Sequence, residues 1–265
     1  MAKLTIHDLF EAKKTGRAFT EIRTSDLREA VACAQAGVEI IMCMKEDLPL
    51  IRPAVPDVFI IAAHNVNLPS VCGADQAVGA AFELMNLGAD AVYSAMSPRV
   101  VEVMARESVP VVGHVGFVPY RSTWFGNKPR AVGKTADEAR KVYQHAKAYQ
   151  DAGAIGVEIE IVPAKVAVEI NRRLDKLILM SMGSGSGATI QYLFATDVLG
   201  TNPGHVPRHA KVYANIGEEE ARVQRLRVEA FKALSADVHS GTYPEEKHLV
   251  KMRDEEFDAF LKGLD

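Results

Sequence analysis

Hydrophobic and polar positions along this chain follow two patterns that alternate. Short runs that are almost entirely apolar, such as VEIIMCM at 38–44 and VFIIAA at 58–63, predict strands buried on both faces. Longer stretches with apolar residues every three or four positions predict helices between them. The expected strands cover residues 18–22, 38–44, 58–63, 91–94, 109–112, 155–162, 177–180 and, with the weakest pattern, 195–199. The expected helices cover residues 4–15, 26–36, 75–87, 99–107, 135–152, 163–174 and 218–237.

Strands and helices alternate about eight times, which predicts a parallel sheet covered by helices. Eight such units in 265 residues fit a closed (β/α)8 TIM barrel better than an open sheet. We expect an α/β fold with one domain over residues 1–265. A short N-terminal helix precedes the barrel, and a C-terminal helix and tail follow it.

The stretch VPVVGHVGFVPYRSTWFG at residues 109–126 carries the first candidate for chemistry. Its apolar start predicts a buried strand, and His114 follows between two glycines. Barrel enzymes place their reactive side chains at the carboxyl ends of the strands. We therefore predict a catalytic role for His114, with a core histidine bonded to a carbonyl as the alternative.

Glu158 and Glu160 stand two residues apart on one predicted strand, so both side chains point to the same face. Their neighbours Val157 and Ile159 then face the helices. Carboxylates directed into a barrel need partners, because burying an unpaired charge is costly. They can act as base and acid or bind a cation. The alternative is a structural salt bridge inside the barrel, with Lys45 or an arginine.

Other polar side chains follow the remaining strands. Lys45 and Glu46 follow the second strand, and Lys45 is a candidate catalytic residue, as a charge anchor or an imine-forming nucleophile. The candidate substrate-binding residues at the third, fourth and seventh strands are His64, Tyr93, Ser94 and Ser184. The sequence around Ser184 is rich in glycine and serine and could hold an anion with backbone N–H groups, although such runs are more often flexible loops.

The composition of the chain limits the classes of molecule that the protein is expected to bind. A net charge of −3 gives no basic surface for nucleic acid, and no apolar run is long enough to cross a membrane. Three cysteines without metal-ligand spacing indicate reduced thiols. We expect a cytoplasmic protein with no leader peptide that acts on a small molecule.

Several stretches together resemble one family, ketopantoate hydroxymethyltransferase. They are VPVVGHVGFVP at 109–119, EIVP at 160–163, PGHVPRHAK at 203–211 and SGTYPEEKH at 240–248, and Thr24-Ser25-Asp26 corresponds to an early Thr-x-x-Asp region. The resemblance covers nearly the whole chain in the same order. It implies a (β/α)8 barrel of the phosphoenolpyruvate/pyruvate superfamily, assembled as a large, decamer-like homo-oligomer.

The resemblance also implies an aldol-type transfer of a hydroxymethyl group from methylenetetrahydrofolate to a 2-oxo acid held by Mg²⁺. Glu160 corresponds to the base, and His114 to the histidine that places the reacting groups. The second-strand acid of the family's metal site, however, falls on Lys45, or on Glu46 after a slip of one residue, and the third-strand acid falls near His64. The fourth-strand pair of the family, a lysine and a metal-supporting glutamate, falls on Tyr93 and Ala95. These residue types suit Mg²⁺ poorly, since it prefers carboxylate oxygen and water.

These departures lead to three hypotheses. In the first, no cofactor is firmly bound, and Lys45 with His64 supplies positive charge in place of the metal. Glu160 or Glu158 then carries a proton in aldol or retro-aldol chemistry, with release of formaldehyde as one form. In the second, the protein is a true 3-methyl-2-oxobutanoate hydroxymethyltransferase of pantothenate biosynthesis. It then uses Mg²⁺ and methylenetetrahydrofolate, with a metal site rebuilt from Glu46, His64 and Glu158. In the third, it is a non-catalytic member of the family that binds a small acid or acts as a subunit of an assembly.

Overall fold

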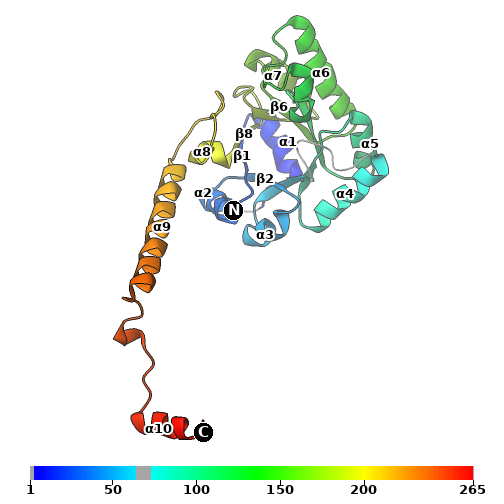
Figure 1. Cartoon of the computed structure of the whole chain (residues 1–265). Helices are drawn as coiled ribbons and strands as arrows, with labels where there is room; N and C mark the ends of the chain where they lie inside the picture. Colours follow the sequence, from blue (N-terminus) through cyan, green and yellow to red (C-terminus); the bar gives the residue numbers. More distant parts are fainter. Residues whose placement is uncertain (1–2, 64–72, 265) are drawn as a thin grey trace. The chain divides into compact units, whose positions relative to one another are not determined.

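A closed barrel of eight parallel strands forms the centre of the computed structural model, which describes residues 3–63 and 73–264 (Figure 1). Each strand pairs with the next along the chain, and the eighth closes on the first. The (β/α)8 fold predicted from the sequence is therefore confirmed. The strands are β1 (Phe19–Arg23), β2 (Ile40–Met44), β3 (Phe59–Ala63), β4 (Ala91–Tyr93), β5 (Val111–Gly116), β6 (Gly156–Glu160), β7 (Ile178–Met182) and β8 (Ile190–Phe194).

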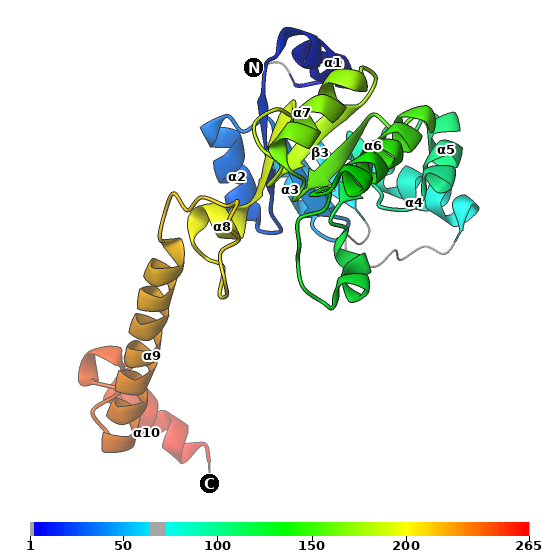
Figure 2. The same ribbon diagram turned by 90° about the horizontal axis from the view of Figure 1, so that it is seen from above.

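Helices connect the strands on the outside of the barrel, as Figure 2 shows from a second direction. Helix α1 (Ile6–Thr15) precedes β1, and the short 3-10 helix η1 (Pro119–Phe125) follows β5. The connecting helices are α2 (Leu27–Ala36), α3 (Leu48–Ala54), α4 (Ala74–Asn86), α5 (Pro98–Arg106), α6 (Ala136–Asp151) and α7 (Ala164–Arg173). Helix α8 (Ala195–Leu199) follows β8.

The structure corrects the prediction at two places. The eighth strand is Ile190–Phe194, and the predicted strand at residues 195–199 is instead helix α8. Burial alternates along this strand, because Ile190 and Tyr192 are buried while Gln191 and Leu193 are half-buried. A prediction based on continuous apolar runs does not identify such a strand. Helix α3 was not predicted, because its seven residues include two prolines.

Side chains alternate along each strand between the barrel interior and the surrounding helices. The inner set includes Phe19, Met42 and Met180, which belong to one buried cluster. The outer set includes Val157 and Ile159, which pack with residues of the helices in a second cluster. Because Val157 and Ile159 point outward, Glu158 and Glu160 on the same strand point into the barrel, as the sequence predicted.

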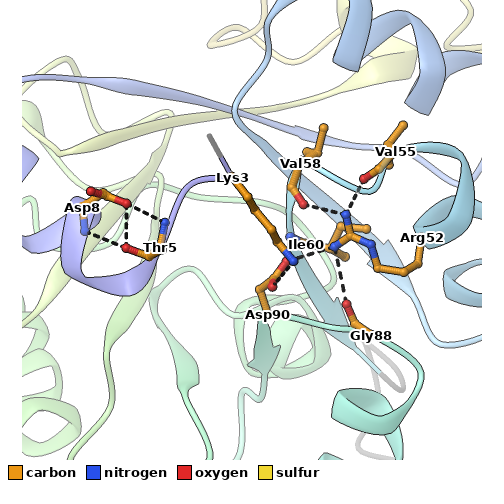
Figure 3. A network of polar contacts seen from close by, with 9 residues as sticks. All are labelled: Lys3, Thr5, Asp8, Arg52, Val55, Val58, Ile60, Gly88 and Asp90. Carbon is orange, nitrogen blue, oxygen red and sulfur yellow. Dashed lines mark hydrogen bonds and ion pairs between the residues drawn. The ribbon is translucent and has the colours of Figure 1, made fainter. Parts of the chain in front are cut away.

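A partly buried network of polar contacts fixes α3 against the amino-terminal ends of β3 and β4 (Figure 3). Arg52 donates to the Asp90 carboxylate at 3.0 Å and to the Val58 carbonyl at 2.9 Å. The same carboxylate accepts from the Ile60 amide at 2.9 Å and pairs with Lys3 at 2.6 Å. Since Asp90 joins these segments at the amino-terminal ends of the strands, the network holds the barrel and leaves the carboxyl ends free for chemistry.

The C-terminal residues, which the prediction included in the single barrel domain, group separately. The chain divides into two compact units, Met1–Ala214 and Asn215–Asp265. The second contains α9 (Ile216–Ser240), a 3-10 turn (Glu246–His248) and α10 (Asp254–Lys262). Among its described residues no side chain is buried, and Phe231 is 72% exposed. In the described part of the chain, no helix combines the length and apolar character needed to cross a membrane.

Gly116, the last residue of β5, allows two strands to meet closely near their carboxyl ends. Its φ is +87°, and a Cβ added there would lie 2.3 Å from the carbonyl oxygen of Glu160. A residue with a side chain would have to adopt a strained conformation and push β6 away. Glycine at this position therefore sets the distance between the strands that carry His114 and Glu160.

We expect Gly116→Ala to destabilise the protein by about 3 kcal/mol or more, because left-handed strain and overpacking add up. Gly16→Ala is the matched control, since Gly16 also has a positive φ of 74° but nothing lies within 4 Å of an added Cβ. This control should cost about 1 kcal/mol. Urea unfolding of both variants measures the difference, and equal losses would show that the contact with Glu160 is unimportant.

Candidate active site

His114 lies inside the barrel on β5, and both of its ring nitrogens have polar neighbours. Nδ1 lies 2.7 Å from Tyr93 Oη and 3.2 Å from Glu158 Oε2. Nε2 lies 2.8 Å from the Phe117 carbonyl oxygen and 3.2 Å from Glu160 Oε2. A carbonyl oxygen can only accept, so Nε2 carries a hydrogen that it donates to Phe117. The ring is thus fixed between two carboxylates.

The surroundings of His114 make it a cation. Burial alone would lower the pKa of the imidazole, but the adjacent carboxylates of Glu158 and Glu160, each 3.2 Å from a ring nitrogen, outweigh this effect and raise the pKa to about 10. At neutral pH both nitrogens therefore carry hydrogens. His114 then acts as a positive hydrogen-bond donor.

Glu158 and Glu160 reach this position because they occupy alternate residues of β6, whose register places them beside His114 and Gly116. Both are buried, with exposures of 3% and 8%. Burial raises the pKa of Glu158, and the His114 cation opposes this rise. Among the described residues, Glu158 Oε1 and Glu160 Oε2 have no hydrogen-bond partner. Glu160 Oε2 is close to Nε2, yet the N–H of Nε2 is directed at Phe117, so this oxygen keeps free capacity to accept a proton.

The predicted substrate-binding residues take different positions. Tyr93 is buried against His114, and burial raises the pKa of its phenol well above the usual value, so the phenol stays protonated. Ser94 is half-buried after β4, and its hydroxyl accepts from the Met96 amide at 3.4 Å. Ser184 donates to the Ile159 carbonyl at 2.8 Å and accepts from the Val162 amide at 2.9 Å. Its hydroxyl thus holds the end of β6, and its contact with a substrate stays a prediction.

Lys45 follows β2 but is not brought to His114. Its ammonium forms an ion pair with Glu83 on α4, outside the barrel interior. Glu46 is exposed in the turn before α3. His64 lies outside the residues that the structure describes. The replacement of a metal by Lys45 and His64 accordingly stays a prediction.

Sequence reasoning missed three interior residues, Glu21 and Arg23 on β1 and Tyr192 on β8. Glu21 and Tyr192 pair in register, and Glu21 is completely buried. Burial raises the pKa of the Glu21 carboxyl well above its usual value, and the charge of Glu158 adds to this. Both effects favour the neutral, protonated form of Glu21 in the folded protein. The signal was present in the sequence FTEIR, where Phe19, Glu21 and Arg23 alternate as Glu158 and Glu160 do.

A wide cleft of about 590 Å³ lies at the opposite end of the barrel. Its lining includes Glu11, Arg17 and Glu39, which belong to α1 and to the amino-terminal ends of β1 and β2. Chemistry in barrels of this type takes place at the carboxyl ends of the strands. We therefore assign the candidate site to the interior cluster around His114 and not to this cleft.

The described residues do not fit Mg²⁺. None of them form a group of three or more His, Cys, Asp or Glu side chains arranged to hold a metal. Glu158 and Glu160 could offer oxygen ligands, but the cationic ring of His114 contacts both. A cation at that place would be repelled by the imidazolium, and Mg²⁺ requires near-octahedral oxygen ligation.

The closed (β/α)8 barrel holds His114 and two carboxylates toward the carboxyl ends of its strands, which is where barrel enzymes place their active sites. The sequence matches the family ketopantoate hydroxymethyltransferase over residues 50–246. This chain therefore belongs to the ketopantoate hydroxymethyltransferase family, as the resemblance implied.

Individual relatives agree over almost the whole chain. The 3-methyl-2-oxobutanoate hydroxymethyltransferase of Acetivibrio thermocellus is 30% identical and is aligned over 95% of this chain and 94% of its own. Enzyme 1 of that name from Methylibium petroleiphilum is 27% identical over 98% and 93%.

Solved structures agree in fold. A 2,3-dimethylmalate lyase, described as a PEP mutase/isocitrate lyase superfamily member, has a TM-score of 0.54 at 11% identity and covers 99% of this chain and 100% of its own. Phosphonopyruvate hydrolase in complex with oxalate and Mg²⁺ has a TM-score of 0.51 at 13% identity, with 98% of both chains covered. At such low identity these two structures support the fold alone.

We expect the His114 ring to remain cationic up to about pH 9, because its folded pKa is about 10. Nitrogen-15 NMR of labelled histidine, assigned with a His114→Gln variant, measures this. His145 is the internal reference, since burial lowers its pKa and its ring should be neutral at pH 7. A midpoint for His114 near pH 6.5 would contradict the paired cation.

We expect Glu21→Gln to change how stability depends on pH. The folded-state pKa of Glu21 is raised, so the folded protein keeps a proton that the unfolded chain loses above about pH 4.5. Stability of the wild type therefore falls as pH rises beyond that value, by up to about 1.4 kcal/mol per pH unit for one proton. The variant lacks this slope and should be more stable than wild type at pH 8 but not at pH 4. Parallel slopes in urea unfolding between these pH values would refute the assignment.

Proposed function

We propose that this protein makes or breaks a carbon–carbon bond by aldol or retro-aldol chemistry on a small 2-oxo acid or hydroxymethyl compound. The observation that carries the proposal is the position of Glu160, buried at the carboxyl end of β6 with an oxygen 3.2 Å from the His114 cation. Such a carboxylate can accept a proton next to a carbonyl, and a fixed cation beside it stabilises negative charge.

In the bond-forming direction, Glu160 removes a proton from the carbon next to the keto group, which leaves an enolate. The enolate carbon attacks the carbon of formaldehyde or its equivalent, and the resulting alkoxide takes up a proton. In the bond-breaking direction, the hydroxyl of the hydroxymethyl group loses its proton, formaldehyde leaves, and the enolate carbon is protonated. His114 and Tyr93 donate hydrogen bonds in the same pocket, and Glu158 keeps the imidazole charged.

The remaining parts of the proposal follow from the sequence. Lys45 and His64 supply positive charge in place of a metal, and the protein works in the cytoplasm as a homo-oligomer without a firmly bound cofactor. For Lys45 this requires that it exchange its ion pair with Glu83 for the substrate. The second candidate is the ordinary activity named for the relatives, 3-methyl-2-oxobutanoate hydroxymethyltransferase, and family membership favours it. That activity uses Mg²⁺ and methylenetetrahydrofolate.

We expect formaldehyde release from the 2-oxo acid that carries a hydroxymethyl group, or the reverse condensation, without added Mg²⁺. Glu160→Gln should lower kcat by about 10² to 10⁴, the usual contribution of a positioned base. Glu169→Gln is the matched control, because Glu169 pairs with Arg172 and Arg173 on the exposed side of α7. A formaldehyde assay with each variant measures the effect.

Three outcomes separate the hypotheses. Full turnover of both Lys45→Ala and Glu160→Gln would end the proposal. Tight Mg²⁺ binding in titration calorimetry, a matching requirement for activity and rescue of a pantothenate auxotroph would establish the ordinary family reaction. Absence of turnover in every condition would leave a non-catalytic protein that binds a small acid.

A further inference from the structure

Arg23 is the last residue of β1 and stands at the carboxyl end of that strand. It shares the interior-facing positions of the strand with Phe19 and Glu21. In register it lies next to Phe194 on β8 and Met42 on β2, which both belong to the inner cluster. Its side chain thus arises at the end of the barrel where the candidate site lies.

The guanidinium of Arg23 lies over an aromatic ring but forms no ion pair with a carboxylate among the described residues. Its central carbon lies 5.0 Å from the centre of the Phe194 ring, which supports the flat group from one side. Its Nε is buried and has no hydrogen-bond partner among the described residues. Leaving such a donor unpaired costs free energy, so the position is suited to an acceptor that arrives from outside.

The charge of Arg23 acts on Glu158, one of the acids of the site. It lowers the pKa of Glu158 against the larger effect of burial. Lys45 differs in this respect, because its ammonium pairs with Glu83 on α4. Of the two cations that end β1 and follow β2, Arg23 is therefore the one directed to the interior.

We propose that Arg23 binds the carboxylate of the substrate and thereby selects small 2-oxo acids over neutral ketones. A planar guanidinium binds a carboxylate through two parallel N–H donors, which orients as well as attracts it. This inference rests on the proposed function for the identity of the ligand. It adds a specificity-determining residue on β1 that faces the proton-carrying residues of β5 and β6 within the barrel.

Binding measurements test the proposal without requiring turnover. Titration calorimetry with 3-methyl-2-oxobutanoate should give a Kd for Arg23→Gln at least about tenfold weaker than for wild type, and an intermediate Kd for Arg23→Lys, which keeps the charge but not the fork. Arg17→Gln is the matched control. Arg17 also stacks on an aromatic ring, that of Phe19 at 4.7 Å, but stands before the same strand at the other end of the barrel. Its Kd should equal that of wild type.

A second ligand separates charge recognition from a structural effect. The neutral ketone 3-methylbutan-2-one has the same branched carbon skeleton without the carboxylate. Wild type should prefer the acid, and Arg23→Gln should lose most of that preference. Equal weakening of both ligands would show a structural role and overturn the proposal. An unchanged Kd in Arg23→Gln, or no binding of the acid by wild type, would also overturn it.

The two proposals fail separately. Binding of the acid through Arg23 without any turnover would refute the proposed function and leave this inference standing. Turnover with an unchanged KM in Arg23→Gln would support the function and refute the inference. Circular dichroism of Arg23→Lys and Arg23→Gln verifies that the variants are folded, and Arg23→Lys keeps the test valid if the glutamine variant unfolds.

Discussion

The candidate site depends on one interaction, the buried His114 imidazolium between the carboxylates of Glu158 and Glu160. Neither sign of charge would be stable alone in a closed barrel, because an unpaired buried ion is strongly disfavoured. Burial acts to neutralise the ring, and the two carboxylates overcome it. The same contacts that hold His114 therefore decide its charge, and one oxygen of Glu160 is left without a hydrogen-bond partner among the described residues.

The barrel provides this arrangement through details of two neighbouring strands. The register of β5 and β6 sets His114 opposite Glu158 and Gly116 opposite Glu160. Gly116 permits the close approach of the strands, and the Phe117 carbonyl orients Nε2. Because these contacts involve the backbone, the positions of the reacting groups depend on the fold itself and not on flexible loops.

Membership of the ketopantoate hydroxymethyltransferase family and the side chains inside this barrel lead to different expectations about how the negative charge of the substrate is balanced. The resemblance to this family implies that a metal ion holds the 2-oxo acid substrate. The described interior instead provides the cations of His114 and Arg23 together with the acids Glu21, Glu158 and Glu160. Residues 3–63 and 73–264 contain no group of three or more His, Cys, Asp or Glu side chains arranged to hold a metal ion, and positive side chains can balance negative charge there instead. The proposed chemistry follows from this difference in charge.

The sequence alone determined the barrel and part of its site. Apolar runs separated by amphipathic stretches identified seven of the strands, and the spacing of Glu158 and Glu160 established that both face inward. It failed at β8, where alternation replaced a continuous apolar run, and at β1, where Glu21 and Arg23 went unnoticed. The sequence did not determine the contacts that individual side chains make. Lys45 follows a strand of the barrel but forms an ion pair with Glu83, and the hydroxyl of Ser184 is hydrogen-bonded to the backbone. Periodicity fixes the direction of a side chain on its own strand, whereas contacts between strands and helices depend on register and packing, which only the tertiary structure decides.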